Sequence, residues 1–294
     1  MIRKLALALG VVLPALSAGT AAEEPSCYSQ AIPRPTLKHQ TILIIDLTTP
    51  AVGAAVESFR TAAQVAAVDP GQRVVILTFA GLAPGQQLTK VLDHVVEAPI
   101  ADAELVENLP IKPFRKSQAC VRRALEVWPA TVSTTLKDIF SANESEGYQR
   151  SEIIYAIAES LRDFAVLGMA TNLMVFSDGL QYGSNTSFYG PDRHPRKIDA
   201  VAELSRLPKT TLDPPAQPLG PTRVQWWGLL TEQAAGRSIA YRDSQTLDQL
   251  RAFWSKLLVG WGVGDVAIGQ SLLNPQLIWP TAQELAMRQT GSAQ

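Results

Sequence analysis

Two short runs of aliphatic residues along the chain each lead into an aspartate. The first is Thr41-Ile-Leu-Ile-Ile-Asp46, and the second is Leu173-Met-Val-Phe-Ser177-Asp178. Short apolar runs rich in aliphatic residues are typical of strands that are buried on both faces of a parallel sheet. Open α/β sheets bind their ligands where such strands end. The pattern therefore predicts that the two aspartates meet at one edge of a parallel sheet.

Further apolar patterns predict strands and helices in alternation along the chain. Additional strands are predicted over residues 73–80, 88–96, 222–230 and 266–273. Helical periodicity predicts helices over residues 51–67, 116–141, 151–164, 197–206 and 246–259. Pro129 falls inside the second of these helices and should kink or split it. Five prolines within residues 208–221 indicate a stiff surface loop.

The order of these elements predicts one three-layer α/β domain over residues 41–274. Residues 88–96 follow 73–80 after a turn that contains glycine and proline, so this pair should be antiparallel. The other strands are separated by helices and should be parallel. We therefore expect a mostly parallel central sheet with one antiparallel edge strand and helices on both faces, as in Rossmann-like folds.

The two ends of the chain differ in character from this domain. Residues 1–22 combine Arg3 and Lys4 with an apolar run and a segment of small residues, which is typical of a cleaved secretory signal peptide. The apolar run is shorter than a membrane span requires, and an uncleaved anchor is the alternative. Residues 23–40 are predicted to form an extended lead-in, and residues 275–294 a C-terminal tail.

Cys27 and Cys120 are the two cysteines of the chain. Export to an oxidising compartment favours a disulfide between them, and closing so long a loop would stabilise the fold by on the order of 4 kcal/mol. The alternative is two unpaired thiols. The cysteines lack Cys-x-x-Cys spacing and the three histidines are scattered, which argues against a zinc site. We expect a periplasmic or secreted bacterial protein with no membrane span after signal cleavage.

The charge balance of the chain excludes one class of partner. The net charge is −1 and charged residues make up 18% of the chain, so no electrostatic basis for binding nucleic acid exists. The 46% of hydrophobic residues allows a sizeable core.

Motifs of common enzyme classes are missing from the sequence. It contains no Gly-x-Ser-x-Gly elbow and no Gly-x-x-x-x-Gly-Lys phosphate loop. A haloacid-dehalogenase-type phosphatase would need a second aspartate two residues after Asp46, where Thr48 stands. Gly260-x-Gly-x-Gly264 follows a helix instead of opening one, and the histidines have no evident catalytic partner. We predict that the protein is not an enzyme, with a metal-dependent hydrolase as an alternative.

Three short motifs, in this order along the chain, resemble those of the von Willebrand factor type A (vWA) domain family. Asp46 and Thr48 match the first and third positions of the Asp-x-Ser/Thr-x-Ser motif that ends the family's first strand. Ser151, followed by apolar residues at helical spacing, is similar to the family's middle hydroxyl residue. The segment Ser177–Gly179 matches its Ser/Thr-Asp-Gly motif. The resemblance covers about residues 40–270.

In the vWA family these loops form a metal-ion-dependent adhesion site, in which a partner's carboxylate completes the coordination of a divalent cation. The resemblance implies that Mg²⁺ is held by water and four side chains: Asp46, Thr48, Ser151 and Asp178. Pro50 stands in place of the motif's second serine and offers no side-chain oxygen. Thr49 is adjacent but should point elsewhere. Because magnesium prefers octahedral oxygen coordination, a weak or lost metal site is the alternative.

The leading hypothesis is an exported, non-enzymatic vWA-like protein of a bacterial envelope that binds a protein partner at the edge formed by Asp46 and Asp178. A scaffold or assembly component with a vestigial metal site is the alternative. An aspartate after a buried strand often orders a turn or caps a helix, so either aspartate alone would suggest structure. Aromatic residues in the following loop (Tyr182, Phe188 and Tyr189) either form a recognition surface or fold the loop onto the domain.

Overall fold

The computed structural model of the protein describes residues 26–49, 53–80, 88–143, 151–183, 186–191, 195–212, 220–230 and 244–269. The predicted signal peptide and the C-terminal tail lie outside these residues, as do Pro50 and His194. Within the described residues, no helix is both long enough and apolar enough to cross a lipid bilayer.

Strands and helices alternate along the described chain. The strands are β1 (His39–Asp46), β2 (Gln72–Phe79), β3 (Thr89–Val96), β4 (Ala170–Phe176), β5 (Thr222–Trp227) and β6 (Asp265–Ile268). The helices are α1 (Ala54–Ala67), α2 (Ala103–Glu107), α3 (Ile111–Asn143), α4 (Ile153–Asp163), α5 (Ala200–Arg206), α6 (Lys209–Leu212) and α7 (Ser244–Gly260).

The strands form one sheet in the order β3-β2-β1-β4-β5-β6. Every neighbouring pair is parallel except β2 and β3, which are antiparallel. This arrangement confirms the predicted fold class, including the antiparallel edge strand. The strand order reverses between β1 and β4, and the crevice at such a reversal is where open α/β sheets bind ligands. Asp46 ends β1 at this point, and Ser177 directly follows β4.

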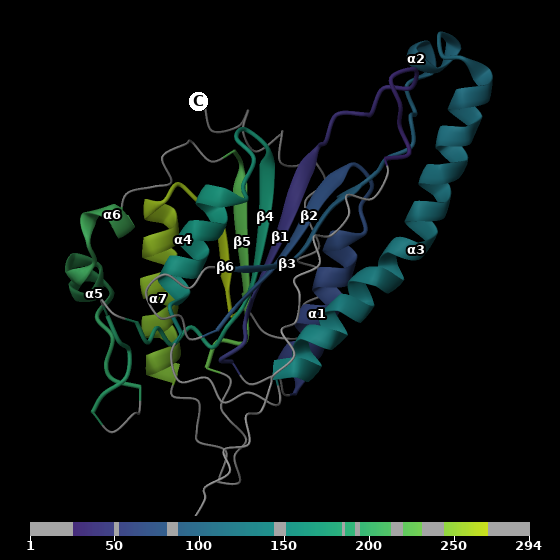
Figure 1. Ribbon diagram of the computed structural model, residues 1–294. Coiled ribbons are helices and arrows are strands. Elements are labelled where there is room, and N and C mark those ends of the chain that lie inside the picture. Colours follow the sequence, from purple (N-terminus) through teal and green to yellow (C-terminus); the bar gives the residue numbers. More distant parts are fainter. Residues whose placement is uncertain are drawn as a thin grey trace, which may run out of the picture.

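Side chains from the central strands enter two separate hydrophobic cores, one on each face of the sheet. Ile42 and Ile44 pack with α4 and α7, whereas Leu43 and Ile45 pack with α1 and α3. Figure 1 shows these two helical layers on opposite sides of the sheet. All eight residues of β1 are buried, which explains why its central run, residues 42–45, is apolar without alternation.

Helix α3 continues through Pro129, so of the two predicted effects, a kink or a split, the split does not occur. Proline removes one backbone hydrogen bond of the helix, and Pro129 itself is exposed. Buried Trp128 and Val132 fasten the helix to the sheet on either side of it, and Trp128 Nε1 donates a 2.7 Å hydrogen bond to the Ala67 carbonyl. Figure 1 shows α3 changing direction along its length.

Two short helices were not predicted from the sequence. Helix α2 is capped by Asp102, whose carboxylate accepts hydrogen bonds from the backbone N–H groups of Glu104 and Leu105. Helix α6 lies inside the proline-rich stretch that we predicted to be a loop throughout. It begins directly after Pro208, because the fixed φ of proline suits the start of a helix.

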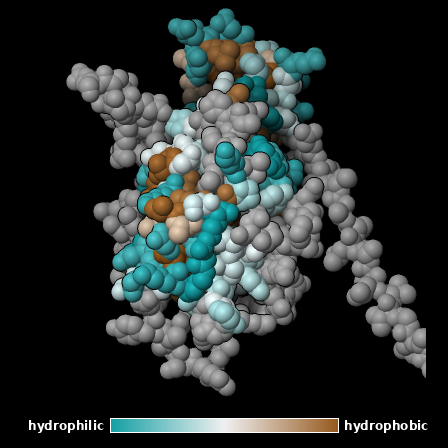
Figure 2. All heavy atoms as spheres, turned by 90° about the vertical axis from the view of Figure 1, so that its left-hand side faces the viewer, coloured by the Kyte–Doolittle hydropathy of each residue, from teal (hydrophilic) through white to brown (hydrophobic). Residues whose placement is uncertain are grey.

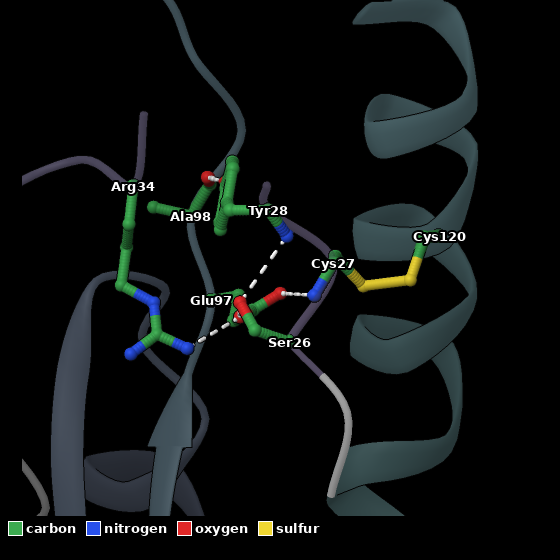
Figure 3. The surroundings of a disulfide bond; sticks show 7 residues. All are labelled: Ser26, Cys27, Tyr28, Arg34, Glu97, Ala98 and Cys120. Carbon is green, nitrogen blue, oxygen red and sulfur yellow. Dashed lines mark hydrogen bonds and ion pairs between the residues drawn. A yellow bond between two sulfur atoms is a disulfide. The ribbon is translucent and has the colours of Figure 1, made fainter. Parts of the chain in front are cut away.

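A disulfide joins Cys27 to Cys120, with their Cα atoms 5.5 Å apart (Figure 3). This confirms the predicted pairing. The bridge fastens the lead-in to α3, and Glu97 strengthens the same junction by accepting hydrogen bonds from Ser26, the Cys27 N–H and Arg34. Beyond this junction lies a projection that we call the arm, residues 101–124, which comprises α2 and the first part of α3. Figure 1 shows the arm extending past the end of the sheet where β1 begins.

Candidate functional site

The carboxylate of Asp46 is fully buried and accepts four hydrogen bonds at the end of β1. Its Oδ1 accepts from the backbone N–H of Thr48 at 2.9 Å and from the Thr48 hydroxyl at 2.6 Å. Its Oδ2 accepts from the hydroxyls of Ser151 and Ser177, each at 2.8 Å. Three loops that are far apart in the sequence therefore converge on one carboxylate.

This pattern of hydrogen bonds determines what the three hydroxyl groups can offer to a ligand. A hydroxyl has one proton and two lone pairs. The protons of Thr48, Ser151 and Ser177 are all directed at Asp46. The Ser177 oxygen also accepts a hydrogen bond from the Gly179 N–H at 3.1 Å. The oxygens of Thr48 and Ser151 thus keep lone pairs that can face a cation or a hydrogen-bond donor.

The loop after β4 places Asp178 beside this cluster. The Asp178 N–H donates to the hydroxyl oxygen of Thr49 at 2.8 Å, which joins the β1 and β4 loops directly. Asp178 Oδ1 accepts the Leu180 N–H at 2.8 Å, and Oδ2 accepts no hydrogen bond from the described residues. Thr49 is buried and its hydroxyl is used in this cross-link, so it does not replace the oxygen that is missing at position 50.

Ser151 is positioned by a short two-way backbone bridge to the loop after β4. Its N–H donates to the Tyr182 carbonyl at 3.3 Å, and its carbonyl accepts the Tyr182 N–H at 2.9 Å. The side chain of Gln181 accepts the N–H of Ile154 in the first turn of α4 at 3.0 Å. The start of α4 and the loop after β4 therefore hold each other in place, and Ser151 projects towards Asp46.

The two carboxylates share an environment that disfavours their charge. Burial raises the pKa of Asp46, and its hydrogen bonds act in the opposite direction. Burial, followed by the negative charge of Asp46, raises the pKa of Asp178 to about 8. No basic side chain of the described residues forms an ion pair with either carboxylate. A site of this kind favours uptake of a proton or of a cation.

Gly179 allows the β4 loop to turn under this site. Its φ is +75°, and a Cβ atom at this position would lie 2.4 Å from Leu229 Cδ1. Its carbonyl accepts a hydrogen bond from the buried Trp254 Nε1 at 3.0 Å, and Trp226 Nε1 donates to the Ser177 carbonyl at 2.9 Å. These two tryptophans are buried in the core and also fix the backbone that carries Asp178.

The aromatic residues of the following loop divide between the two alternatives left open by the sequence. Phe188 is fully buried and packs against Phe253, so it folds the loop onto the domain. Tyr182 is 38% exposed and makes an edge-to-face contact with Tyr189. Burial and the charges of Asp178 and Asp46 raise the pKa of Tyr189, so this ring lies near enough to the carboxylates for their charge to act on it. The two tyrosines are therefore the aromatic residues available at the rim of the site.

The four residues singled out as metal ligands come together in the fold. Thr48 and Ser151 each donate a hydrogen bond to Asp46, and Asp178 is close enough to Asp46 for their charges to interact. Whether these residues bind a metal stays a prediction. Sequence reasoning assigned no role to the Ser177 hydroxyl, although the Ser-Asp-Gly motif could have suggested one. It left two roles open for Tyr189, whose position depends on the path of the loop.

The donor set is compatible with a hard cation. Across the part of the chain that the structure describes, no group of three or more His, Cys, Asp or Glu side chains is arranged to hold a metal ion. A cation here would instead depend on two carboxylates, hydroxyl oxygens and water. These are the oxygen donors that magnesium accepts, and magnesium usually keeps several of its waters.

The chain matches no protein-family model and no curated protein. Among solved structures, it is similar to an aerotolerance-related membrane protein from Bacteroides fragilis, with 12% identity and a TM-score of 0.38 over 85% of this chain and 97% of that one. It is also similar to the conserved hypothetical protein BatB from Bacteroides thetaiotaomicron, with 13% identity and a TM-score of 0.36 over 86% and 97% of the two chains. The pilus adhesin SpaC from Lactobacillus rhamnosus GG shows 11% identity and a TM-score of 0.38, over 88% of this chain and 30% of that one. Likenesses this distant carry no argument about function.

Proposed function

We propose that this protein is an exported, vWA-like binding protein that holds a divalent cation between the loops after β1 and β4 and recognises a protein partner there. One observation carries the proposal: two buried carboxylates and three hydroxyl groups converge at the reversal point of the sheet, with no ion pair to a described basic side chain. A divalent cation would supply the missing positive charge.

Each residue has a distinct part in this proposal. Asp46 supplies charge and holds the hydroxyl protons, so that the oxygens of Thr48 and Ser151 are presented to the cation. Asp178 offers Oδ2, while its Oδ1 is held by the Leu180 N–H. Water would complete the coordination where Pro50 supplies no oxygen. An acidic side chain of the partner could replace one of these waters, and Tyr182 and Tyr189 would contact the surface around it.

Calorimetric titration with MgCl₂ and with MnCl₂ tests the cation site. We expect saturable binding to the wild-type protein, and binding weakened by about tenfold or more in Asp178→Asn and Ser151→Ala, because each removes an oxygen from the proposed set. Asp248→Asn is the matched control, since Asp248 is an exposed carboxylate on α7. Wild-type protein that shows neither heat nor a thermal shift with either metal would contradict the proposal.

The scaffold alternative makes a different prediction about partners. Pro50 motivates it, because a site that has lost a ligand is free to lose its metal while the fold continues to serve assembly. Binding of envelope proteins can be compared in magnesium and in chelator, with wild-type protein and with an Asp46→Ala/Asp178→Ala variant. Partners that are retained by the double variant favour the scaffold, and partners lost both in the variant and in chelator favour the cation site.

Metal-dependent hydrolysis is a third candidate, and we propose that the protein does not catalyse it. No histidine or lysine of the described residues forms an ion pair with either carboxylate, and both cysteines are joined in the disulfide. Turnover of phosphate or ester substrates with divalent metals, abolished by Asp46→Ala, would contradict this.

A further inference from the structure

One helix face on the arm carries a stripe of positive charge. At 100° per residue, its cations project within about 120° of one another along about 17 Å of α3. They are Lys112, Arg115, Lys116, Arg122 and Arg123, and all five are exposed. The buried residues Ser117 and Val121 lie on the opposite face, so the stripe faces solvent. Glu126 lies on the same side and marks the end of the stripe.

The same arm carries a negative segment at its tip. Helix α2 and its cap hold the exposed carboxylates of Asp102, Glu104 and Glu107. Neither these carboxylates nor the five cations of α3 form an ion pair with any described residue. Within one copy the two charged segments therefore remain unneutralised, although they are close in sequence.

The boundary between the two charged segments is apolar. Ile111 begins α3 at this boundary and is 69% exposed, the highest value for a large hydrophobic side chain among the described residues. Leu105 on α2 is 38% exposed. Figure 2 shows hydrophobic atoms among hydrophilic ones at the top of the molecule, where the tip of the arm lies.

We propose that the arm is a self-association surface, on which a second copy of this chain docks antiparallel. A twofold axis at Ile111 sets α2 of each copy against the basic stripe of the other, and brings the two Ile111 side chains together on the axis. In an isologous dimer, the same surface of each copy faces the other in the opposite direction. A surface with a negative segment followed by a positive one is therefore complementary to itself. An anionic membrane would neutralise the stripe but would repel the carboxylates of α2 beside it.

The disulfide holds the part of α3 that carries the stripe in place. Cys120 lies inside the stretch of α3 that carries the stripe, and its bond to Cys27 fastens this part of the helix to the lead-in (Figure 3). The arm lies at the end of the sheet where β1 begins, whereas Asp46 lies where β1 ends. Two copies joined through their arms would leave the Asp46 end of each copy uncovered.

The contact area of two arms is small for a permanent dimer, so we expect weak, salt-sensitive association. Sedimentation of the oxidised protein at about 100 μM should show a dimer in about 20 mM salt and a monomer in about 500 mM salt. Arg122→Glu/Arg123→Glu and Glu104→Lys/Glu107→Lys should each be at least about tenfold weaker in self-association, because each places like charges opposite one another. Lys137→Glu is the control, because it reverses the charge of an exposed residue nearer the other end of α3. This variant should dimerise as the wild-type protein does.

Mixing the two double variants provides the decisive test. In a mixed dimer, one contact has wild-type charges on both sides, and in the other the two glutamates of Arg122→Glu/Arg123→Glu face the two lysines of Glu104→Lys/Glu107→Lys. The mixture should therefore form heterodimers at a lower protein concentration than either variant alone forms dimers. Wild-type protein that stays monomeric at low salt overturns the proposal, as does a mixture that stays monomeric. Monomeric protein that instead sediments with phosphatidylglycerol vesicles, and loses this binding in Arg122→Glu/Arg123→Glu, overturns it in favour of a membrane surface.

Discussion

Individual hydrogen bonds give the residues of the candidate site unequal roles. Asp46 uses both of its oxygens to accept four hydrogen bonds, so it acts on a ligand chiefly through its charge and through the hydroxyls that it orients. Asp178 accepts one hydrogen bond from the described residues, and its second oxygen is available. The hydroxyl oxygen of Thr49 accepts a hydrogen bond from the backbone N–H of Asp178. Its neighbour Pro50 has no side-chain oxygen to offer. A carboxylate that organises its neighbours and one that contacts the ligand should respond differently to substitution.

Gly179→Ala should destabilise the protein by about 2–4 kcal/mol, because alanine is strained at positive φ and its Cβ would clash with Leu229. Gly168→Ala is the matched control: its φ is +73° and nothing lies within 4 Å of the added atom, so it should lose only about 1–2 kcal/mol. Urea denaturation of both variants measures the difference. Equal losses of unfolding free energy in the two variants would contradict this prediction, because they would show that the Leu229 side chain moves away from the added methyl group at no cost.

Among the elements, α3 connects the two ends of the molecule. Its second half packs on the sheet through Val132 and Leu136, whereas its first half belongs to the arm, where few side chains are buried. The arm therefore gains little stability from hydrophobic burial. It depends on the junction at which Cys27, Glu97 and the lead-in meet α3 (Figure 3).

Replacing both cysteines in Cys27→Ser/Cys120→Ser should lower the free energy of unfolding by about 2–4 kcal/mol, because the bridge closes a loop with a sequence separation of 93 residues. Limited proteolysis should also cleave the variant earlier within residues 101–124 than the oxidised wild type. The reduced wild-type protein is the control and should behave as the variant does. Identical denaturation midpoints for the oxidised wild type and the variant would contradict this role of the disulfide.

For the whole molecule, the strand order decides where chemistry can occur. Because β1 and β4 are neighbours in the sheet, residues 46 and 178 share one edge although they are far apart in sequence. The buried carboxylates that meet there are unfavourable for the fold unless a proton or cation neutralises them. The stability of the entire domain should therefore depend on pH and on divalent metal.

Without metal, the free energy of unfolding should fall as the pH rises from about 4 to about 8. The pKa of Asp178 is raised from 3.8 to about 8 in the folded protein, so within this window the folded state keeps a proton that the unfolded state has lost. Each pH unit then removes at most about 1.4 kcal/mol. Asp178→Asn should reduce this dependence, as measured by denaturation in chelator, and the pKa of Asp46, which burial also raises, should leave a smaller slope of the same sign. A wild-type slope that persists undiminished in Asp178→Asn would assign it to other groups.

Much of the fold could be predicted from the sequence because its determinants are local. The aliphatic run before Asp46 reads as a strand buried on both faces, and the structure places it at the centre of the sheet. The order of strands and helices was sufficient for the parallel sheet and for the antiparallel β3. For Pro129 the sequence left a kink or a split open, and the helix is not split because Trp128 anchors it, which is a property of the packed helix and not of its sequence.

For the candidate site, the sequence by itself determined which groups are present: two strand-terminal aspartates, hydroxyl residues near each, and a proline where a further hydroxyl would stand. Only the tertiary structure decided how they are used. The convergence of Ser151 and Ser177 on Asp46 and the cross-link from Thr49 to Asp178 are contacts between distant segments. They depend on sheet order and loop path, because only the folded backbone brings their donors and acceptors within reach of one another.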